Sequence, residues 1–249
     1  MENYNISESF ILPSLGRIYD PSVAPEVTLR SMNTNDEMRR LAPSEYQYKQ
    51  MSDVIDNCIL SGPEISSYDM CLGDYQFLLH RLRMVTYGDE LSIKTRCPYC
   101  KFDNDDVLKL SELPIIQYNE ELNSLFEIEL PVTKKIVKLR YQTPRMLDNI
   151  SQGARDLKKR VKDKNQDFSL LLSLTSMIDT IDGIKHDRTK LESWARELPM
   201  KDTNAIYSAA TKINNSIGVE TELTISCALC GTEYKYSFRP GPDFFNPVG

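Results

Sequence analysis

Cys97-Pro98-Tyr99-Cys100 and Cys227-Ala228-Leu229-Cys230 are the stretches that decide the fold, because each places two cysteines in a turn between segments of strand composition. Residues 90–95 and 107–110 flank the first pair, and residues 222–226 and 232–238 flank the second. A tight turn of this spacing lets two thiolates converge on one ion, and two such turns complete a tetrahedron. The sequence therefore predicts one structural zinc ion with four ligands, which are Cys97, Cys100, Cys227 and Cys230.

Residues 101–226 separate the two pairs, whereas a compact zinc ribbon usually brings its second pair within a few tens of residues. The matching flanks nevertheless predict an α+β fold with one zinc-ribbon-like β module, residues 89–112 and 220–240, interrupted by a long, mainly helical insertion, residues 113–219. Two redox dithiols or four ordinary buried thiols are the alternatives, but neither pair precedes a predicted helix whose N-terminus would lower a thiol pKa.

The two remaining cysteines are expected to lie outside the metal site. Cys58 and Cys71 lie inside or at the edges of predicted helices, where a free cysteine behaves as a small buried hydrophobic residue.

The composition is that of an ordinary globular protein and excludes several classes. The 249 residues include 30 Lys+Arg and 36 Asp+Glu, and the resulting formal charge of −6 argues against a chain built mainly to neutralise phosphates. Hydrophobic residues make up 41%, and no apolar run is long enough to predict a membrane span. The first residues lack the pattern of a secretory signal, so we expect a reducing, cytoplasmic setting.

Residues 1–88 are predicted to form an N-terminal strand followed by helices. The strand is expected at residues 27–30, and Thr34-Asn35-Asp36-Glu37 has the pattern of a capping box that starts a helix. Two further helices are expected at residues 46–60 and 69–87. On the last of them an apolar stripe faces the core while Arg81 and Arg83 face elsewhere. The stripe consists of Tyr75, Leu78, Leu79, Leu82 and Val85.

The insertion is predicted to contain a hairpin followed by helices. The hairpin strands are expected at residues 126–130 and 135–140, and the helices at residues 145–164, 167–182, 187–197 and 202–216. The buried face of the second helix consists of Leu171, Leu174, Thr175, Ile178 and Ile181.

Two parts of the chain resemble each other. The first part contains Leu12-Pro13, Val27-Thr28-Leu29-Arg30, Thr34 and Met38, and the second contains Leu130-Pro131, Val137-Lys138-Leu139-Arg140, Thr143 and Met146. In both parts a threonine that can cap a helix follows the strand, and Pro144 occupies the first helical position in the second. A duplicated strand-to-helix unit would explain this echo, although two copies are too few for a solenoid.

No enzyme class fits the sequence. His80 and His186 are accompanied by no nucleophile motif, phosphate-binding glycine loop or zinc-protease helix, and both are expected to be surface or capping residues. Asp103, Asp105 and Asp106 form an acidic run that is typical of a solvated turn rather than of a paired acid and base. The sequence therefore predicts a non-enzymatic protein without a catalytic site.

A nucleic-acid-binding zinc protein is the main rival prediction, because many zinc ribbons contact DNA or RNA. The candidate residues near the cysteines are Lys94, Arg96, Lys101, Phe102, Lys235 and Tyr236, and those of a basic stretch are Arg155, Lys158, Lys159, Arg160, Lys162 and Lys164. Acidic residues interrupt the stretch and the total charge is negative, so a solvated helix face is favoured and nucleic-acid binding is not expected.

Residues 241–249 form a C-terminal tail that contains two adjacent aromatic residues, Phe244 and Phe245. They either cap the core of this chain or anchor a partner protein, since aromatic anchors dominate many interfaces. Both residues are therefore candidate partner-binding residues.

Several short motifs, taken in their order along the chain, indicate a family. They are Leu12-Pro13-Ser14 with Gly16 and Tyr19-Asp20, Val27-Thr28-Leu29-Arg30, Asp74-Tyr75-Gln76-Phe77-Leu78-Leu79 with Arg83, Tyr87-Gly88-Asp89, and the first cysteine pair. In this order they resemble the baseplate hub and hub-assembly proteins of T-even-type contractile-tailed bacteriophages. The resemblance is clearest over residues 10–110 and returns at the second cysteine pair.

This resemblance implies a factor that assembles the tail baseplate hub by binding other hub proteins in the cytoplasm of the infected host. A structural hub subunit of the virion tail baseplate is the alternative within the same family. In either case the resemblance implies binding between proteins, with the metal as a clamp and no covalent chemistry.

Overall fold

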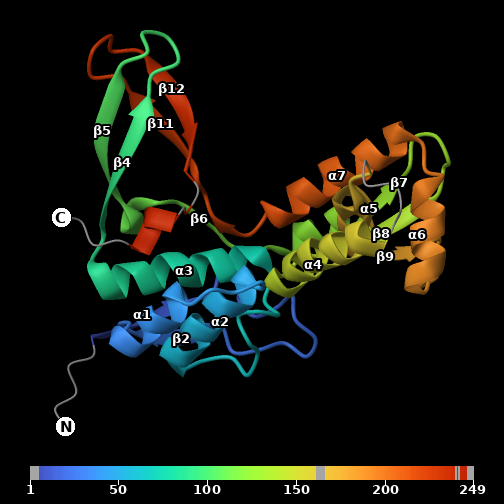
Figure 1. Ribbon diagram of the computed structural model, residues 1–249, viewed down its shortest axis with the longest axis horizontal. Coiled ribbons are helices and arrows are strands. Elements are labelled where there is room, and N and C mark those ends of the chain that lie inside the picture. The colour runs from blue at the N-terminus through green and yellow to red at the C-terminus, as the bar shows by residue number, and fades with distance from the viewer. Residues whose placement is uncertain (1–5, 161–165, 239, 241, 246–249) are drawn as a thin grey trace.

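The computed structural model describes residues 6–160, 166–238, 240 and 242–245, and the protein has an α+β fold. Figure 1 shows an N-terminal body, a helix-rich body beside it, and an arm of two hairpins that rises from the N-terminal body. One hydrophobic core extends from the N-terminal body into the arm, and a second lies in the helix-rich body. In the part of the chain that the structure describes, no helix is long and apolar enough to cross a membrane.

The N-terminal body contains a ββααβ unit whose antiparallel sheet has the order β1-β2-β3. Its elements are β1 (Ser7–Ile11), β2 (Glu26–Arg30), α1 (Thr34–Leu41), α2 (Gln47–Cys58) and β3 (Ile59–Ser61). The strand predicted at residues 27–30 is the central strand of this sheet. Val27 and Leu29 are fully buried, whereas Thr28 lies on the opposite face, because successive side chains of a strand alternate.

The insertion contains a second ββααβ unit with the equivalent strand order, β7-β8-β9. Its elements are β7 (Glu127–Glu129), β8 (Ile136–Leu139), α4 (Pro144–Arg160), α5 (Phe168–Met177) and β9 (Ile178–Ile181). The register shifts between Lys138 and Leu139, as it does between Thr28 and Leu29 in the first unit. The repeated unit suggested by the sequence echo is therefore confirmed at the level of chain path. Helices α6 (Arg188–Arg196) and α7 (Met200–Asn214) complete the second core.

The start of α1 differs from the prediction by one residue. Asn33, rather than Thr34, caps the helix, and its Oδ1 accepts hydrogen bonds from the amides of Asn35 and Asp36 at 2.9 and 3.2 Å. The Asp36 carboxylate accepts the Asn33 amide in return at 3.0 Å, which completes a capping box. In the second unit Thr143 Oγ1 accepts the Met146 amide at 3.3 Å. Asn33 and Thr143 are therefore equivalent, and Met146 occupies the position of Asp36.

One predicted helix of the insertion ends earlier than expected. Residues 178–181 of the helix predicted at 167–182 form the edge strand β9. Ile178 and Ile181 are three residues apart, which is the spacing of a helix, but pairing with β8 across a register shift makes this segment a strand. The helix predicted at 145–164 is α4, and residues 161–165, including Lys162 and Lys164, lie outside the described residues.

Helix α3 (Leu72–Tyr87) lies between the N-terminal body and the arm, and its predicted apolar stripe is buried. The prediction that Arg83 faces away from the core is wrong, because this side chain is fully buried. It donates to the carbonyl oxygens of Gly88, Glu90 and Phe244 at 2.7, 3.1 and 2.9 Å. Arg83 thus joins the end of α3, the start of the arm and the C-terminal segment.

The C-terminal segment packs on α3 through the short helix η3 (Pro242–Phe245). Phe244 and Phe245 are 3% and 5% exposed, so they lie in the core of this chain, the first of the two alternatives expected for them. His80 is buried as well, rather than at the surface, and its ring lies 5.2 Å from that of Phe244 and 5.9 Å from that of Phe238. We therefore do not propose these phenylalanines as partner anchors.

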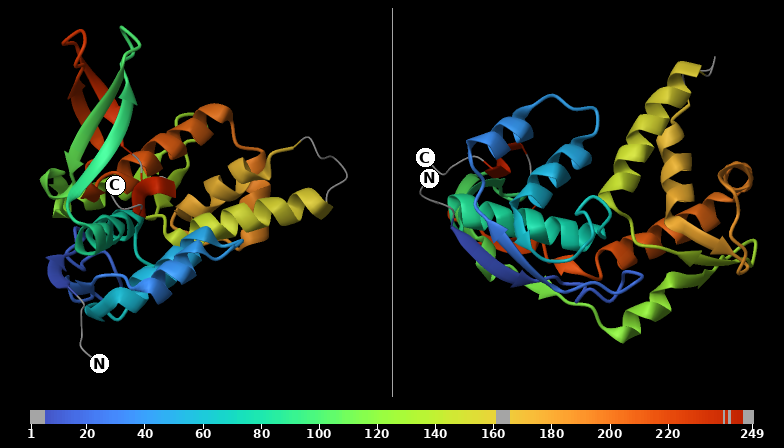
Figure 2. Two further views of the ribbon diagram at one scale, coloured as in Figure 1. Left: turned by 60° about the vertical axis from the view of Figure 1, so that its left-hand side comes forward. Right: turned by 90° about the horizontal axis from the view of Figure 1, so that it is seen from below.

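The arm consists of two antiparallel hairpins, which lie side by side in Figure 2. The first pairs β4 (Glu90–Arg96) with β5 (Asp103–Lys109), and the second pairs β11 (Glu222–Ser226) with β12 (Glu233–Ser237). The acidic run at residues 103–106 therefore belongs to a strand rather than to a solvated turn, because Asp103 and Asp105 face Arg96 and Lys94 across the ladder.

The two ends of the insertion meet at the base of the arm. Strand β6 (Ile115–Ile116) pairs there with β10 (Gly218–Val219). The N-terminus of α3 presses against β10, where a Cβ on Gly73 would lie 2.2 Å from the carbonyl oxygen of Ile217. Because only glycine permits this approach, α3 fixes the point at which the chain returns to the arm.

Candidate metal centre

The two cysteine pairs occupy equivalent turns at the tip of the arm. In the first turn the Cys97 amide donates to the Phe102 carbonyl at 2.9 Å, and the Lys101 amide donates to the Cys97 carbonyl at 3.1 Å. In the second turn the Cys227 and Gly231 amides make the matching bonds at 3.1 and 2.9 Å. The same local backbone therefore presents both pairs of sulfur atoms.

The residue after each second cysteine adopts a positive φ. This angle is 70° at Gly231 and 64° at Lys101. Glycine reaches this conformation without the Cβ clash that a lysine incurs, so the second turn is the less strained of the two.

The four predicted ligands meet across the two hairpins. The Sγ atoms of Cys97, Cys100, Cys227 and Cys230 all lie within 4.8 Å of one another. The Cys100–Cys227 pair is 3.5 Å apart and the Cys97–Cys230 pair 3.9 Å apart, and all four cysteines are free of disulfides. A tetrahedral ion with metal–sulfur bonds of about 2.3 Å requires sulfur separations of about 3.8 Å. The four cysteines can therefore bind one metal ion.

The electrostatics of the cluster favour a cation. Hydrogen bonds from the side chain and backbone of Thr232 lower the pKa of Cys230 to about 6. At Cys100 the backbone amide of Phe102 favours the thiolate, but desolvation and hydrogen bonds with the other cysteines outweigh it and raise the pKa to about 12. Four thiols this close cannot all lose their protons unless a positive charge lies among them.

A buried polar network, which no sequence pattern predicts, joins the two hairpins beneath the cysteines. Asn104 accepts the Ala228 amide at 2.9 Å through Oδ1 and donates to the Tyr234 hydroxyl at 3.0 Å through Nδ2. The Tyr234 hydroxyl also lies 2.7 Å from Thr95 Oγ1. Since every member is satisfied, the network positions the second turn against the first.

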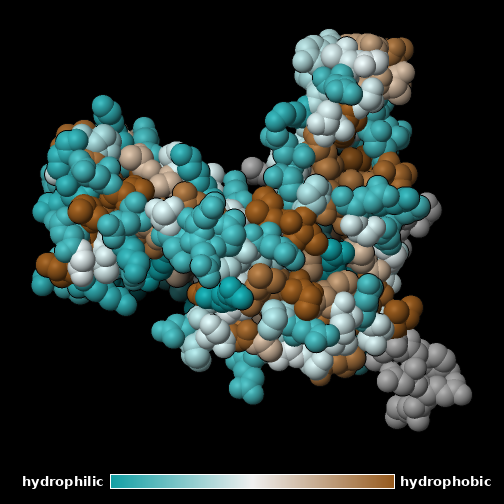
Figure 3. Space-filling view, turned by 180° about the vertical axis from the view of Figure 1, so that it is seen from behind, coloured by the Kyte–Doolittle hydropathy of each residue, from teal (hydrophilic) through white to brown (hydrophobic). Residues whose placement is uncertain are grey.

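The surroundings of the cluster suit a structural metal better than a catalytic one. Four protein sulfurs complete a tetrahedral shell and leave no coordination position for a substrate. The tip exposes Tyr99 and Leu229, which are 66% and 65% accessible, and Figure 3 shows hydrophobic colour there. A metal ion bound there would therefore hold the tip as a fixed surface.

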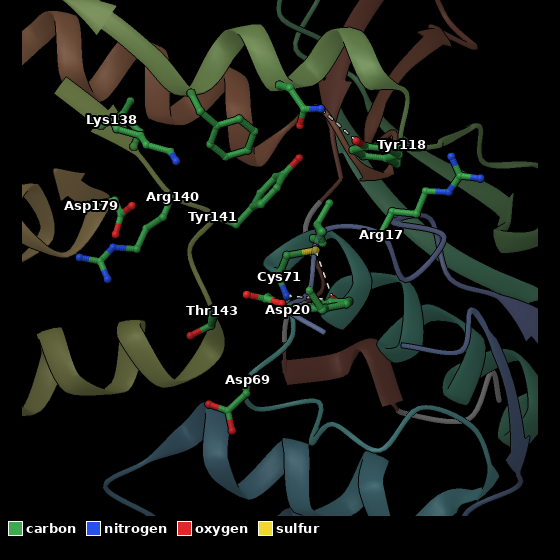
Figure 4. A pocket seen from close by; sticks show the side chains of 15 residues that line it. Arg17, Asp20, Asp69, Cys71, Tyr118, Lys138, Arg140, Tyr141, Thr143 and Asp179 are labelled. Carbon is green, nitrogen blue, oxygen red and sulfur yellow. Dashed lines mark hydrogen bonds between the residues drawn. The ribbon is translucent and has the colours of Figure 1, made fainter. Parts of the chain in front are cut away.

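A pocket far from the arm tip lies between the two ββααβ units (Figure 4). Its volume is about 710 Å³, and Cys71 and Tyr19 line it beside the buried carboxylate of Asp74. Burial raises the pKa of Cys71 and of Asp74. A thiol that keeps its proton is a poor nucleophile, so the pKa shift of Cys71 is opposite to that of an activated cysteine.

The basic residues near the cysteines are largely neutralised. Lys94 and Arg96 each lie 3.8 Å from an aspartate of β5, and Lys235 pairs with Glu222. This arrangement gives little net positive charge for tracking a phosphate backbone.

Comparisons with known proteins identify the family. Neither the curated proteins nor the solved structures give a match. Residues 3–246 match a family model described as T4 bacteriophage base plate protein. Since this match covers nearly the whole chain, the protein belongs to the T4 bacteriophage base plate protein family.

Proposed function

We propose that this chain is a non-enzymatic assembly factor of the phage tail baseplate hub, which acts by binding other hub proteins in the cytoplasm of the infected host. The observation that carries the proposal is the family match over residues 3–246, since membership of this family gives the protein a structural or assembly role in the baseplate. The tip of the arm, where Cys97 and Cys227 meet, supports it, because a closed four-sulfur cluster suits a scaffold.

The proposed mechanism uses binding energy alone. A metal ion at the tip would hold the two hairpins in one arrangement, and a fixed surface loses less conformational entropy when a partner binds. By holding one hub protein in its assembly-competent state, the factor would lower the cost of adding the next.

Reconstitution of the hub from its purified components tests this role. We expect complete hubs to form more slowly, or in lower yield, when this chain is omitted. Normal rate and yield without the chain would contradict the proposal. The composition of finished tails separates the alternatives, because an assembly factor is absent from purified particles whereas a structural hub subunit is present in them.

We further propose that the metal is zinc, bound by the cysteine quartet. Elemental analysis should find about one zinc ion per chain, and Cys97→Ser or Cys227→Ser should lose it together with thermal stability. Cys58→Ala is a matched control, because Cys58 is a buried free thiol outside the cluster and should leave the zinc content unchanged. Purified protein without zinc, in which disulfides form readily within each pair, would instead support a thiol oxidoreductase.

Nucleic-acid binding is the competing function. A titration against single-stranded and double-stranded DNA and RNA at several salt concentrations separates the two readings, since phosphate contacts give a steep loss of affinity with salt. We expect weak or absent binding even at low salt.

A further inference from the structure

The repeated unit allows one buried arginine to be compared with its counterpart. Arg30 ends β2 and donates through Nη2 to the Asn57 carbonyl at 2.9 Å, near the junction of α2 and β3. Arg140 directly follows β8 and donates through Nη2 to the Ile178 carbonyl, at the junction of α5 and β9. The two guanidinium groups thus occupy equivalent places in the two units.

The two guanidinium groups differ in whether a carboxylate neutralises their charge. In the first unit Asp36 lies in the first turn of α1 and accepts from Arg30 Nη1 at 2.6 Å and from Nη2 at 3.4 Å. In the second unit the equivalent position in the first turn of α4 is Met146, which carries no charge. Among the described residues, no carboxylate lies within ion-pair distance of Arg140, and its buried Nε has no hydrogen-bond partner. A buried donor of this kind costs free energy unless a ligand satisfies it.

Arg140 opens onto two pockets. Asp179 lines the larger pocket with it, and Figure 4 shows the Arg140 guanidinium on the side of Asp179, away from Tyr141. The second pocket, of about 270 Å³, is bordered by both Arg140 and Met146, so it lies where the missing carboxylate would be.

The lining of this second pocket combines apolar side chains, among them Ile150, Leu172 and Leu191, with cationic and polar groups. Arg188 and His186 contribute to it together with the amide of Asn149, and no acidic residue lines it. Arg188 pairs through Nε with Glu192 at 2.6 Å but is 72% exposed, so it remains accessible to an incoming group. The pocket therefore combines a recessed guanidinium with a second one at its edge, which is the arrangement that binds a carboxylate.

We propose that this pocket, bounded by Arg140, Met146 and Arg188, binds an aspartate or glutamate side chain of another baseplate protein. The first unit supplies the template, since there the equivalent guanidinium of Arg30 pairs with a carboxylate. That the carboxylate comes from a baseplate protein rests on the proposed assembly role, whereas the carboxylate site itself does not. In the first unit the arginine pairs with a carboxylate of the same unit, whereas in the second unit the carboxylate would come from a partner protein.

The direct test uses the NMR signals of the arginine Nε–Hε groups in the full-length protein, with Arg140→Lys to assign the signal. The probe is N-acetyl-glutamate N′-methylamide, which has a single carboxylate. We expect the Arg140 signal to shift in a saturable way with a dissociation constant on the order of millimolar. The signal of Arg30, which already pairs with Asp36, is the internal control and should not move.

Two probes establish the chemistry of the ligand. The glutamine analogue has the same shape without the charge, and it should cause no saturable shift. Inorganic phosphate should bind no more tightly than the glutamate probe. Equal shifts with the glutamine analogue, or phosphate binding more than tenfold tighter, would overturn the assignment of a carboxylate.

Two variants at one position complete the test. Met146→Asp should rebuild the ion pair of the first unit, so that the melting temperature rises by about 2–4 °C and Arg140 no longer responds to the probe. Met146→Asn has nearly the same size without the charge and should retain the response. A Met146→Asp protein that still responds like wild type would overturn the proposal, and if this variant fails to fold, the wild-type titration still decides.

Capture of hub components then distinguishes the site from the assembly role. Met146→Asp should bind the hub components at least tenfold more weakly, while Met146→Asn should bind them like wild type. A saturable NMR response without any effect of Met146→Asp on capture would leave the carboxylate site intact and would reject its use in assembly.

Discussion

In the first ββααβ unit the guanidinium of Arg30 is neutralised by Asp36 of the same unit, whereas in the second the equivalent Arg140 donates to a carbonyl oxygen and forms an ion pair with no carboxylate of the described residues. The strand order and the register shift next to the central arginine are the same in both units. The difference teaches that the backbone path does not require the ion pair. It depends instead on alternating apolar side chains such as Val27 and Val137, which are fully buried in their respective cores.

The largest expected effect comes from removing the ion pair between Arg30 and Asp36. Burial acts to raise the pKa of Asp36, but hydrogen bonds from Arg30 and the Asn33 amide outweigh it and lower the pKa below its usual value. Asp36→Asn should therefore reduce the free energy of unfolding by about 3–5 kcal/mol, since it leaves a buried guanidinium without a counter-charge. Urea denaturation measures this. Arg140→Met should cost less than about 1.5 kcal/mol, and equal costs in the two units would contradict the difference between them.

A second contrast concerns pH, because the first core contains a buried histidine and the described part of the second core contains none. Burial lowers the pKa of His80 to about 4. The unfolded chain binds this proton near pH 6.5, so the stabilisation is complete above that pH and is lost as the pH falls towards 4, by up to about 3 kcal/mol.

The measurement is the difference in unfolding free energy between wild type and His80→Gln from pH 7 to pH 4, in which the contributions of the carboxylates cancel. The difference should shrink as the pH falls. A difference independent of pH would show that His80 becomes protonated in the folded protein without cost.

The next prediction concerns the contact between the two units. Asp148 on α4 accepts the amides of Tyr48 and Lys49 at 3.3 and 2.8 Å and the Tyr68 hydroxyl at 3.1 Å, so it caps α2 of the other unit. Asp148→Ala should cost about 2 kcal/mol, because α2 has no other side-chain cap at its first residues. Hydrogen exchange should show the loss in α2 as well as in α4, whereas the control Asp156→Ala should leave α2 unchanged.

The smallest expected effect compares the two helix caps. Asn33 accepts two amides and Thr143 accepts one. Asn33→Ala should therefore cost about 1 kcal/mol and Thr143→Ala about 0.5 kcal/mol in thermal or urea unfolding. A larger cost at Thr143 would reverse the ranking of the two units.

Much of the local structure could be predicted from the sequence because it depends on neighbouring residues. The apolar stripe of α3, the β4 and β11 strands and the echo between the two units all follow from periodicity within a few residues. The cysteine quartet could be predicted because thiolate chemistry and spacing restrict what such pairs do, and the structure places the four sulfurs together.

The residues whose environment was predicted wrongly have partners that are distant in the chain. Arg83 looks like a surface residue until the carbonyl of Phe244 is brought beside it, and His80 until Phe238 and Phe244 cover it. The sequence of β9 predicts the end of a helix, but pairing with β8 makes this segment a strand. Single-sequence patterns do not show such distant contacts, so the default exposure of charged residues gave the wrong prediction.

The sequence by itself determined the chemistry of this protein: two cysteine pairs in turns between strands, two similar strand-to-helix units and a family-like order of motifs. Only the tertiary structure decided where charges are buried and which of them remain unpaired. A covalent spacing is fixed along the chain, whereas a counter-charge can come from any segment that folding brings near. For that reason Arg30 and Arg140, which look alike in the sequence, differ in the folded molecule.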